Sequence, residues 1–360
     1  MRPSSSTTSS ERGLWAWAAA AFLAPALLYA GGLVGGLALA PHLGPDHGLD
    51  AKRALLAARP ALIFAGDSRA ARHLEPATAA RLLGWPAEQV ANVAVSAGDA
   101  VMAADLAGQE PAAFAGAAVV VSVSAFQVND GDRERLSGAL LRRLTPWQAL
   151  RLCWPDVVRP LHHHLRASLQ DALRPPPAPQ VPPAGGFEGV DASLGPYDLV
   201  ALRTNPWYEP WRPDGYKQLA LAAALAALKS RARALLVYNG PLAPSYRALA
   251  ELAPHHRHEA DHAAALGALC RELGVAYRDY RALPGLDDSD FYNATHLNVR
   301  GARRFTAHVV ADLRADSLLP AGPAGQAAFS RTFRRQPRPG QRTTPAARVS
   351  GGNAPLDRSS

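Results

Sequence analysis

Short apolar runs alternate with helical stretches between residues 54 and 318, which predicts one folded domain of about 265 residues. Five of the runs are short and rich in Val, Leu and Ala, as expected of strands. Nearly continuous apolar runs of this kind suit parallel strands that are buried on both faces. The expected strands are Ala61–Ala65, Val90–Val95, Ala118–Val123, Ala234–Tyr238 and Gly274–Tyr277.

Helical patterns separate these runs, at about residues 69–83, 216–232, 259–273 and 298–314. Strands that alternate with helices predict a doubly wound α/β domain with a parallel sheet. Residues 131–213 contain no strong strand and are expected to form an insertion between the third and fourth strands. Because open α/β sheets bind ligands at the carboxyl ends of their strands, such an insertion is a candidate roof for a ligand site.

A different pattern precedes the domain, because residues 14–40 contain no charged residue across 27 positions. A bilayer core needs about 20 apolar residues in a helix, so this segment is long enough to span a membrane. We expect an uncleaved signal anchor, with residues 1–13 in the cytoplasm and the domain outside the cytoplasmic membrane, in the periplasm. A cleavable signal peptide is the alternative. Ala38-Leu39-Ala40 resembles its cleavage site, but Pro41 would obstruct processing.

The net charge of +8 is concentrated at the other end of the chain. Residues 320–360 carry seven arginines and one aspartate, which account for +6, and leave a nearly balanced body. This stretch is rich in Pro, Gly and Ser and predicts a disordered basic tail. The charge therefore does not argue for a nucleic-acid partner. The only two cysteines, Cys153 and Cys270, exclude a Cys-rich zinc module and leave a disulfide between them open.

Two segments at opposite ends of the domain carry candidate chemistry. Gly66-Asp67-Ser68 follows the first expected strand and precedes a helix, where a serine is presented at the sheet edge and free backbone N–H groups favour negative charge. The tripeptide alone is also typical of a helix cap. His296 lies in a polar loop before the last expected helix, from which it can reach the same edge. Since a serine nucleophile needs a base within hydrogen-bond distance, the two predict a nucleophile–base pair.

At these residues the chain resembles the SGNH/GDSL hydrolase family. Gly66-Asp67-Ser68 resembles the first block of the family, Ser96-Ala97-Gly98 its glycine block and Asn293-x-x-His296 its last block. The run 292–302 is most similar to the membrane-anchored DltD- and AlgJ-like branch, whose members act beside membrane-bound O-acyltransferases. The resemblance implies a three-layer, flavodoxin-like domain in which the serine is the nucleophile and the histidine the base.

Two positions depart from the pattern of that family. The residue expected to be the aspartate of a triad is Asn293, whose side-chain oxygen can accept the imidazole N–H but supplies no negative charge. Asp290 and an unassisted Ser–His dyad are the alternatives. The asparagine that normally completes the oxyanion hole is also displaced after the third strand. The expected oxyanion donors are the backbone N–H groups of Ser68 and Gly98, with a side chain from Asn129 or Ser124.

The resemblance and the expected anchor together imply a serine esterase or O-acyltransferase. It would move acyl groups, most simply acetyl, on esters of a cell-envelope glycan through an acyl-enzyme on Ser68. The implied partners are the envelope carbohydrate, the inner membrane and a membrane-bound O-acyltransferase. No Gly-rich phosphate loop, His-Glu-x-x-His or paired Cys-x-x-Cys occurs, so no cofactor or metal is expected. The alternative is a non-catalytic partner with the same fold that binds glycan or assists assembly.

Overall fold

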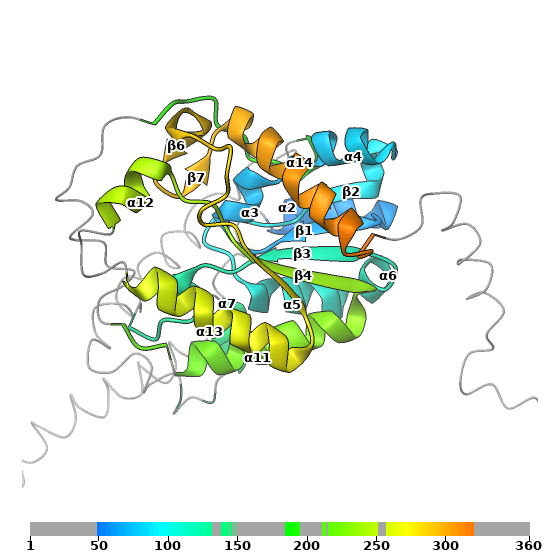
Figure 1. Cartoon of the computed structure of the whole chain (residues 1–360). Coiled ribbons are helices and arrows are strands. Elements are labelled where there is room, and N and C mark those ends of the chain that lie inside the picture. The colour runs from blue at the N-terminus through cyan, green and yellow to red at the C-terminus, as the bar shows by residue number, and fades with distance from the viewer. Residues whose placement is uncertain are drawn as a thin grey trace, which may run out of the picture. The chain divides into compact units, whose positions relative to one another are not determined.

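Five parallel strands form the central sheet of the computed structural model, in the order β2-β1-β3-β4-β5 (Figure 1). This order is the flavodoxin-like arrangement of a doubly wound sheet, so the predicted parallel α/β architecture is confirmed. The structure describes residues 49–131, 138–143, 145, 148, 184–194, 211–213, 215–250 and 257–319. The strands are β1 Leu62–Ala65, β2 Val90–Asn92, β3 Ala118–Ser122, β4 Ala234–Asn239 and β5 Ala276–Asp279.

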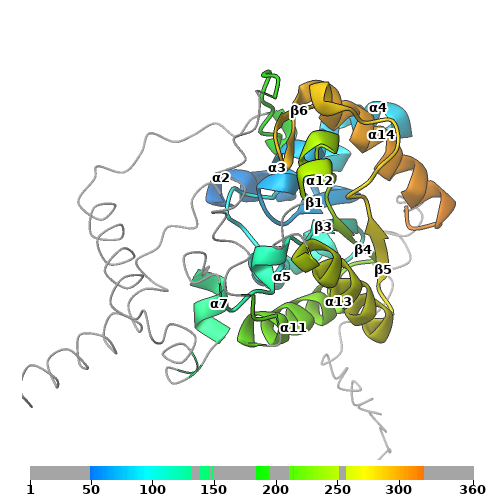
Figure 2. The same ribbon diagram turned by 60° about the vertical axis from the view of Figure 1, so that its left-hand side comes forward.

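Helices cover both faces of the sheet and give three layers, as Figures 1 and 2 show. One face carries α3 Ser68–His73, α4 Pro76–Leu83 and α14 Val299–Ala315. The opposite face carries α5 Ala100–Gln109, α11 Tyr216–Arg231 and α13 Arg257–Leu273. The smaller helices are α2 Leu49–Arg53, α6 Pro111–Phe114, α7 Gly138–Arg143 and α12 Pro244–Ala250.

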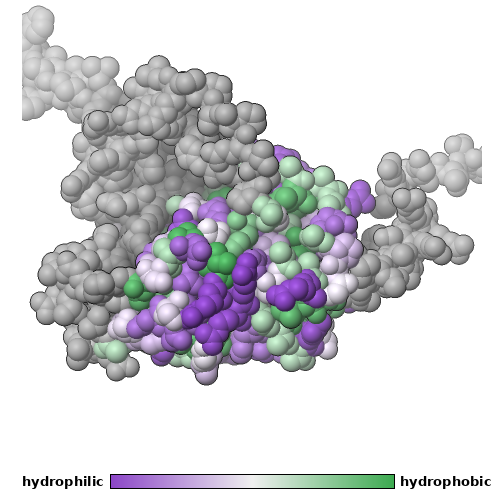
Figure 3. Space-filling view, turned by 90° about the horizontal axis from the view of Figure 1, so that it is seen from above, coloured by the Kyte–Doolittle hydropathy of each residue, from purple (hydrophilic) through white to green (hydrophobic). Residues whose placement is uncertain are grey.

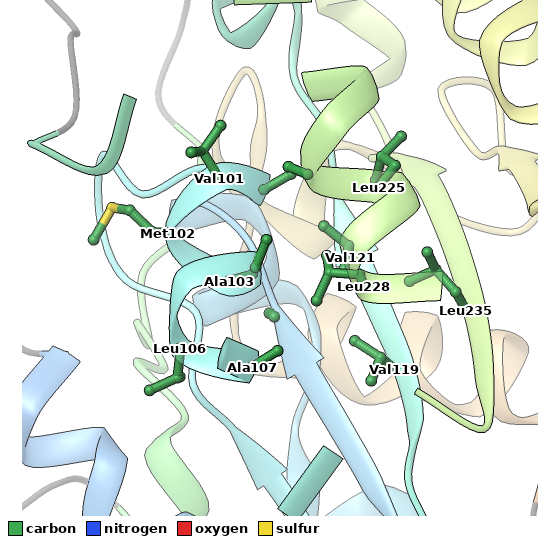
Figure 4. Packing of buried hydrophobic residues seen from close by; sticks show 14 of the residues in the cluster. Val101, Met102, Ala103, Leu106, Ala107, Val119, Val121, Leu225, Leu228 and Leu235 are labelled. Carbon is green, nitrogen blue, oxygen red and sulfur yellow. The ribbon is translucent and has the colours of Figure 1, made fainter. Parts of the chain in front are cut away.

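Alternate residues of each central strand enter two separate hydrophobic cores. Val119 and Val121 of β3 point to α5 and α11, where they meet Leu106, Leu225 and Leu228 (Figure 4). Their neighbours Ala118 and Val120 belong to the other core, with Phe305 of α14. Because both faces are buried, the central strands are apolar over most of their length, which explains the continuous runs in the sequence.

Two element boundaries differ from the sequence expectation. The expected helix over 69–83 is two helices, because the residue before a proline avoids helical backbone and Pro76 therefore starts a new helix. Asn92 stabilises the break, since its side-chain amide donates to the carbonyls of Ala70 and Leu74, each at 2.8 Å. The last strand begins two residues later than expected, because Gly274 adopts a left-handed φ of +60° after α13.

A small antiparallel pair, which the sequence pattern does not predict, lies beside α12 at one end of the main sheet (Figure 1). It is formed by β6 Phe291–Asn293 and β7 His296–Leu297. Each strand is too short to show a period of two. The pair nevertheless contains Asn293 and His296, the two residues of the expected last block, and fixes their positions.

One described part of the insertion, residues 184–194, packs along α3 and the start of α14. Glu188 donates its backbone N–H to the Ala71 carbonyl at 2.9 Å, and the Val190 carbonyl accepts from Val299 at 3.1 Å. The Glu188 carboxylate also binds Lys52 of α2 at 2.7 Å. This segment therefore connects α2, which precedes β1, to α3, which follows β1.

The outer surface of α14 is strongly polar, in contrast to its inner side. Phe305, Val309 and Leu313 are buried against the sheet, while Arg300 and Arg303 face outward. Figure 3, seen from above Figure 1, shows a hydrophilic patch on this face with smaller hydrophobic areas around it. An amphipathic stripe of this kind is what holds a surface helix on a sheet.

Several predictions fall on residues outside those that the structure describes. They are the cytoplasmic segment 1–13, the anchor 14–40, most of the insertion 131–213 and the basic tail 320–360. Within the described part of the chain, no helix is both long and apolar enough to cross a bilayer. Cys270 is a buried free thiol whose pKa is raised to about 12 by burial, and Cys153 lies outside the described residues.

Candidate active site

Ser68 is presented by a sharp turn between β1 and α3. Gly66 has a φ of +117°, and a Cβ atom there would lie 2.6 Å from the Ser122 hydroxyl. Only glycine fits this backbone conformation at such close approach to β3. Asp67 then caps the helix by accepting the Arg69 backbone N–H at 3.0 Å. The helix-cap function of this tripeptide and the exposure of its serine are therefore compatible, and Ser68 becomes the first residue of α3.

The Asp67 carboxylate is fully buried and anchors the floor of the site. One of its oxygens accepts from the Ser122 hydroxyl at 2.6 Å, and the other accepts from the Gln127 amide at 3.1 Å and from the Ser124 hydroxyl. Hydrogen bonds to a buried carboxylate offset its desolvation. Together they lock the turn that carries Ser68 to the end of β3.

His296 lies next to Ser68, as expected of a base. Its Nε2 is 2.8 Å from the Ser68 Oγ, although 228 positions separate the two residues in the chain. β7 holds the histidine at the edge where β1 ends, and the side chain is 9 % exposed. The pair borders a cavity of about 170 Å³. Its lining residues are Asp67, Ser68, Arg69, Ala97, Ser124, Phe126, Thr295 and His296.

Asn293 orients the imidazole of His296. Its Oδ1 lies 3.0 Å from the His296 Nδ1 and accepts the backbone N–H groups of Thr295 and His296, also at 3.0 Å. Because an amide oxygen only accepts, the Nδ1 must carry the proton, which leaves Nε2 free to accept from Ser68. The Thr295 hydroxyl lies 3.2 Å from the same Nδ1. The tautomer is therefore the one that a general base needs.

Asp290, the alternative orienting group, does not contact the imidazole. Its carboxylate accepts from the Arg300 Nε at 2.8 Å, from the Arg304 Nη1 at 2.6 Å and from the Asp287 backbone N–H at 3.1 Å. The side chain is fully buried and points to the start of α14. Asp290 belongs to the framework of the loop, so the expectation that it substitutes for a triad aspartate is wrong.

The expected oxyanion donors do not all reach the site. Ser68 is the first residue of α3, and its backbone N–H has no partner within the helix. The Gly98 N–H instead donates to the Val95 carbonyl at 2.9 Å, which closes a turn. Ala97 occupies the cavity wall, at a left-handed φ of 59°. The glycine block therefore borders the cavity through Ala97, and Gly98 serves the turn.

Neither side-chain candidate for the oxyanion hole is placed to donate into the cavity. Ser124 lines the cavity but donates its hydroxyl proton to Asp67. The Asn129 side-chain oxygen accepts the backbone N–H groups of Gly131 at 2.9 Å and Arg212 at 2.8 Å. Asn129 thus joins the two ends of the insertion and is not part of the cavity wall. The expected asparagine has become a structural residue.

Arg69 is a component of the site that the sequence reasoning does not identify. Its side chain is 4 % exposed, with Nη1 3.2 Å from the Asn239 Oδ1 and Nη2 3.7 Å from a Glu259 carboxylate oxygen. A buried guanidinium next to the candidate nucleophile is compensated by this carboxylate. Its position directly after Ser68 was the available signal, but arginine in a first helical turn is ordinarily solvent-exposed.

The described residues contain no group of His, Cys, Asp and Glu side chains that could hold a metal ion. Compared with models of protein families and with curated proteins, the chain gives no match to either. The arrangement itself holds a serine hydroxyl, a correctly oriented imidazole and a free helix N–H around one small cavity. These are the groups that acyl transfer through a serine requires.

Proposed function

We propose that this chain is a membrane-anchored, SGNH-type serine esterase or O-acyltransferase of the cell envelope, with the domain in the periplasm. The observation that supports it most strongly is the 2.8 Å contact between the Ser68 hydroxyl and the His296 Nε2. Asn293 would be the third member of the triad and would orient His296, because its Oδ1 lies 3.0 Å from the His296 Nδ1. The proposed substrate is an acyl ester of an envelope glycan, and the proposed partner is a membrane-bound O-acyltransferase.

In the proposed reaction, His296 Nε2 takes the Ser68 proton as Oγ attacks the acyl carbon. The carbonyl oxygen becomes an oxyanion beside the Ser68 N–H, and one such donor contributes roughly 3–4 kcal/mol in related chemistry. When the intermediate collapses, the bond to the leaving alkoxide breaks and His296 returns the proton to it. Water or a carbohydrate hydroxyl then gives its proton to His296 and attacks the acyl-serine. The bond between the acyl carbon and the Ser68 Oγ breaks, and His296 returns the proton to Oγ.

The size of the cavity favours a short acyl group. At about 170 Å³ it is smaller than the roughly 300–1,000 Å³ that binds drug-sized ligands. Phe126 and Ala97 form apolar parts of its wall. We therefore infer that the acyl group bound here is a short one such as acetyl.

The proposed anchor would hold this site close to the membrane. Lys52 of α2 is buried and donates to the Ala94 carbonyl, just beyond β2, and to Glu188. The few residues from Ala40 to Leu49 can reach at most roughly 30 Å when extended. A domain that begins within this reach of the membrane would suit an acyl group that is delivered at the membrane surface.

Covalent labelling with a fluorophosphonate probe tests the proposal. We expect wild-type protein to be labelled, Ser68→Ala to lose labelling completely and His296→Ala to slow it by on the order of 10³-fold or more. Ser96→Ala is the matched control, because this exposed serine precedes Ala97 of the cavity wall but does not itself line the cavity. A folded wild-type protein that resists the probe would overturn the proposal. Labelling that persists in Ser68→Ala would do the same.

A non-catalytic role in glycan binding is the second candidate. Asn293 in place of a carboxylate and the structural use of Gly98 and Asn129 favour it. This candidate predicts that glycan binding survives in Ser68→Ala and His296→Ala and that the wild type lacks esterase activity. The esterase proposal predicts hydrolysis of a short acyl ester, such as p-nitrophenyl acetate, by the wild type alone.

A further inference from the structure

A second histidine lies behind the candidate base. His73 is the last residue of α3, is fully buried and places its ring centroid 6.1 Å from that of His296, edge to face. Its Nε2 is 3.0 Å from the carbonyl oxygen of Thr295, the residue that precedes His296. Its ring also meets the Phe305 ring, at 5.8 Å. The short helix α3 therefore begins at Ser68 and ends at His73, which contacts the loop that carries His296.

The protonation state of His73 follows from these contacts. A carbonyl oxygen only accepts, so the Nε2 carries a proton and donates it to Thr295. The Nδ1 has no hydrogen-bond partner and faces the backbone at Gly240, where an added Cβ would lie 3.2 Å from it. Burial, together with the nearby His296 and Arg69, holds the pKa of His73 well below its usual range. His73 is therefore neutral and adds no charge beside the imidazolium that His296 would form.

The peptide that joins Thr295 to His296 is held from both sides. Asn293 accepts its N–H, that of His296, at 3.0 Å, and His73 donates to its carbonyl, that of Thr295. The imidazole of His296 follows this peptide directly, so any rotation of the peptide moves Nε2 relative to the Ser68 hydroxyl. An apolar residue would fill the space behind the loop, but only a donor at this point fixes the direction of the carbonyl.

We propose that His73 is a positioning residue that fixes the His296 imidazole against Ser68 through its hydrogen bond to the Thr295 carbonyl. This inference rests on the proposed function, because it assigns a role within the same Ser–His pair. It adds a link between α3 and β7 that does not touch the substrate. The geometry of the pair then depends on the neutral Nε2–H form of His73, with Asn293 as the other constraint.

The test uses the full-length chain and three variants. His73→Gln keeps an N–H that can reach the Thr295 carbonyl, and His73→Leu removes the donor but fills the space. His262→Leu is the matched control. That histidine is also buried, also contacts a backbone carbonyl, that of Val123 at 3.2 Å, and also has an Nδ1 without a partner, but it lies outside the His296 loop.

The measurement is fluorophosphonate labelling as a function of probe concentration and pH, on protein shown to be folded by circular dichroism. For His73→Leu we expect the maximal labelling rate to fall by up to about 100-fold, because a small misplacement of a catalytic group has an effect of this size. The probe concentration that gives half of the maximal rate should not change. We also expect the pH midpoint of labelling to shift. His73→Gln should retain most of the rate, and His262→Leu should match wild type.

Equal labelling by His73→Leu and wild type would overturn the inference, as would equal loss in His73→Gln and His73→Leu. Histidine NMR separates this failure from failure of the proposed function, because it needs no reaction. If the wild type does not react with the probe, the proposed function fails. An altered tautomer or pKa of His296 in His73→Leu, and not in His262→Leu, would still support the positioning contact, whereas an unchanged His296 signal would overturn it.

Discussion

The Ser68 hydroxyl lies 2.8 Å from the Nε2 of His296, across the carboxyl edge of the sheet. Ser68 is placed by the tight turn after β1, and His296 by the short β6–β7 pair. Each residue is held by its own set of buried hydrogen bonds, through Asp67 on one side and Asn293 on the other. The contact is therefore preorganised before any substrate binds, which is what an acyl-transfer site requires.

Asn293→Asp should increase the reactivity of Ser68 and move its pH dependence. A carboxylate 3.0 Å from Nδ1 favours the imidazolium, so the pKa of His296 should rise. Because the base must be neutral, the rising limb of the labelling profile should move to higher pH, by about one unit for ~1.4 kcal/mol of interaction. The plateau rate should increase, since the charge that forms on His296 is now stabilised. An unchanged midpoint would show that residue 293 does not act on the imidazole.

Asn293→Ala is the complement of that experiment. It removes the acceptor of the imidazole N–H and of two backbone N–H groups. We expect the labelling rate to fall by about 10–100-fold in protein that remains folded, because the tautomer and orientation of His296 are no longer fixed. A rate equal to that of wild type would favour an unassisted Ser–His dyad.

Asp290→Asn should lower stability and leave the chemistry intact. The carboxylate joins Arg300 and Arg304 to the loop before β6, and both arginines are about half exposed. We expect the free energy of unfolding to fall by roughly 1–3 kcal/mol, measured by urea denaturation. The labelling rate per folded molecule should stay close to that of wild type. A selective loss of labelling would return Asp290 to the list of catalytic candidates.

Gly66→Ala should displace Ser68. Alanine at a φ of +117° is strained by on the order of 1–3 kcal/mol, and its Cβ would lie 2.6 Å from the Ser122 hydroxyl. We expect a lower melting temperature and a loss of labelling that exceeds the loss of folded protein. Gly116→Ala is the control, since an added Cβ there meets no atom within 4 Å. If both variants behave alike, the turn does not position Ser68.

Stability should fall as the pH is lowered from 7.5 to 5.5. Burial lowers the pKa values of His73 and His262 in the folded state. Below about pH 6.5 the unfolded chain binds protons that the folded chain does not, so protonation favours unfolding. Thermal melting at several pH values measures the effect. His262→Gln should flatten the dependence, and an equally steep dependence in that variant would exclude His262 as a contributor.

The full-length chain should remain in membranes after washing with alkaline carbonate, as expected of the charge-free run 14–40. A chain truncated before Leu49 should be released into the soluble fraction and still react with the probe, because α2 and its buried Lys52 are kept. A full-length protein that is recovered in soluble form, with an N-terminus just after Ala40, would instead show that the segment is a cleaved signal peptide.

The sequence by itself determined the parallel α/β architecture and the two residues that meet at its edge. The reason is that a strand buried on both faces is apolar over most of its length, as residues 118–121 of β3 are, and that strand ends carry local turn signals such as Gly66. Both properties are local, so they can be read from neighbouring positions. The break before Pro76 shows that even a local boundary is missed when the helical pattern continues through it.

Only the tertiary structure decided which polar groups surround that pair. Asp290 and Asn293 lie three positions apart, yet Asp290 binds two arginines and Asn293 binds the imidazole of His296. The two side chains have different surroundings because Asp290 precedes β6 and Asn293 ends it. Gly98 and Asn129 carry the expected residue types, but the Gly98 N–H donates to the Val95 carbonyl, and the Asn129 Oδ1 accepts from the Arg212 backbone. The role of His73 likewise depends on a contact with Thr295, 222 positions away. The contacts of His73 and of Asn129 with Arg212 are set by packing between distant segments, and no local pattern encodes them.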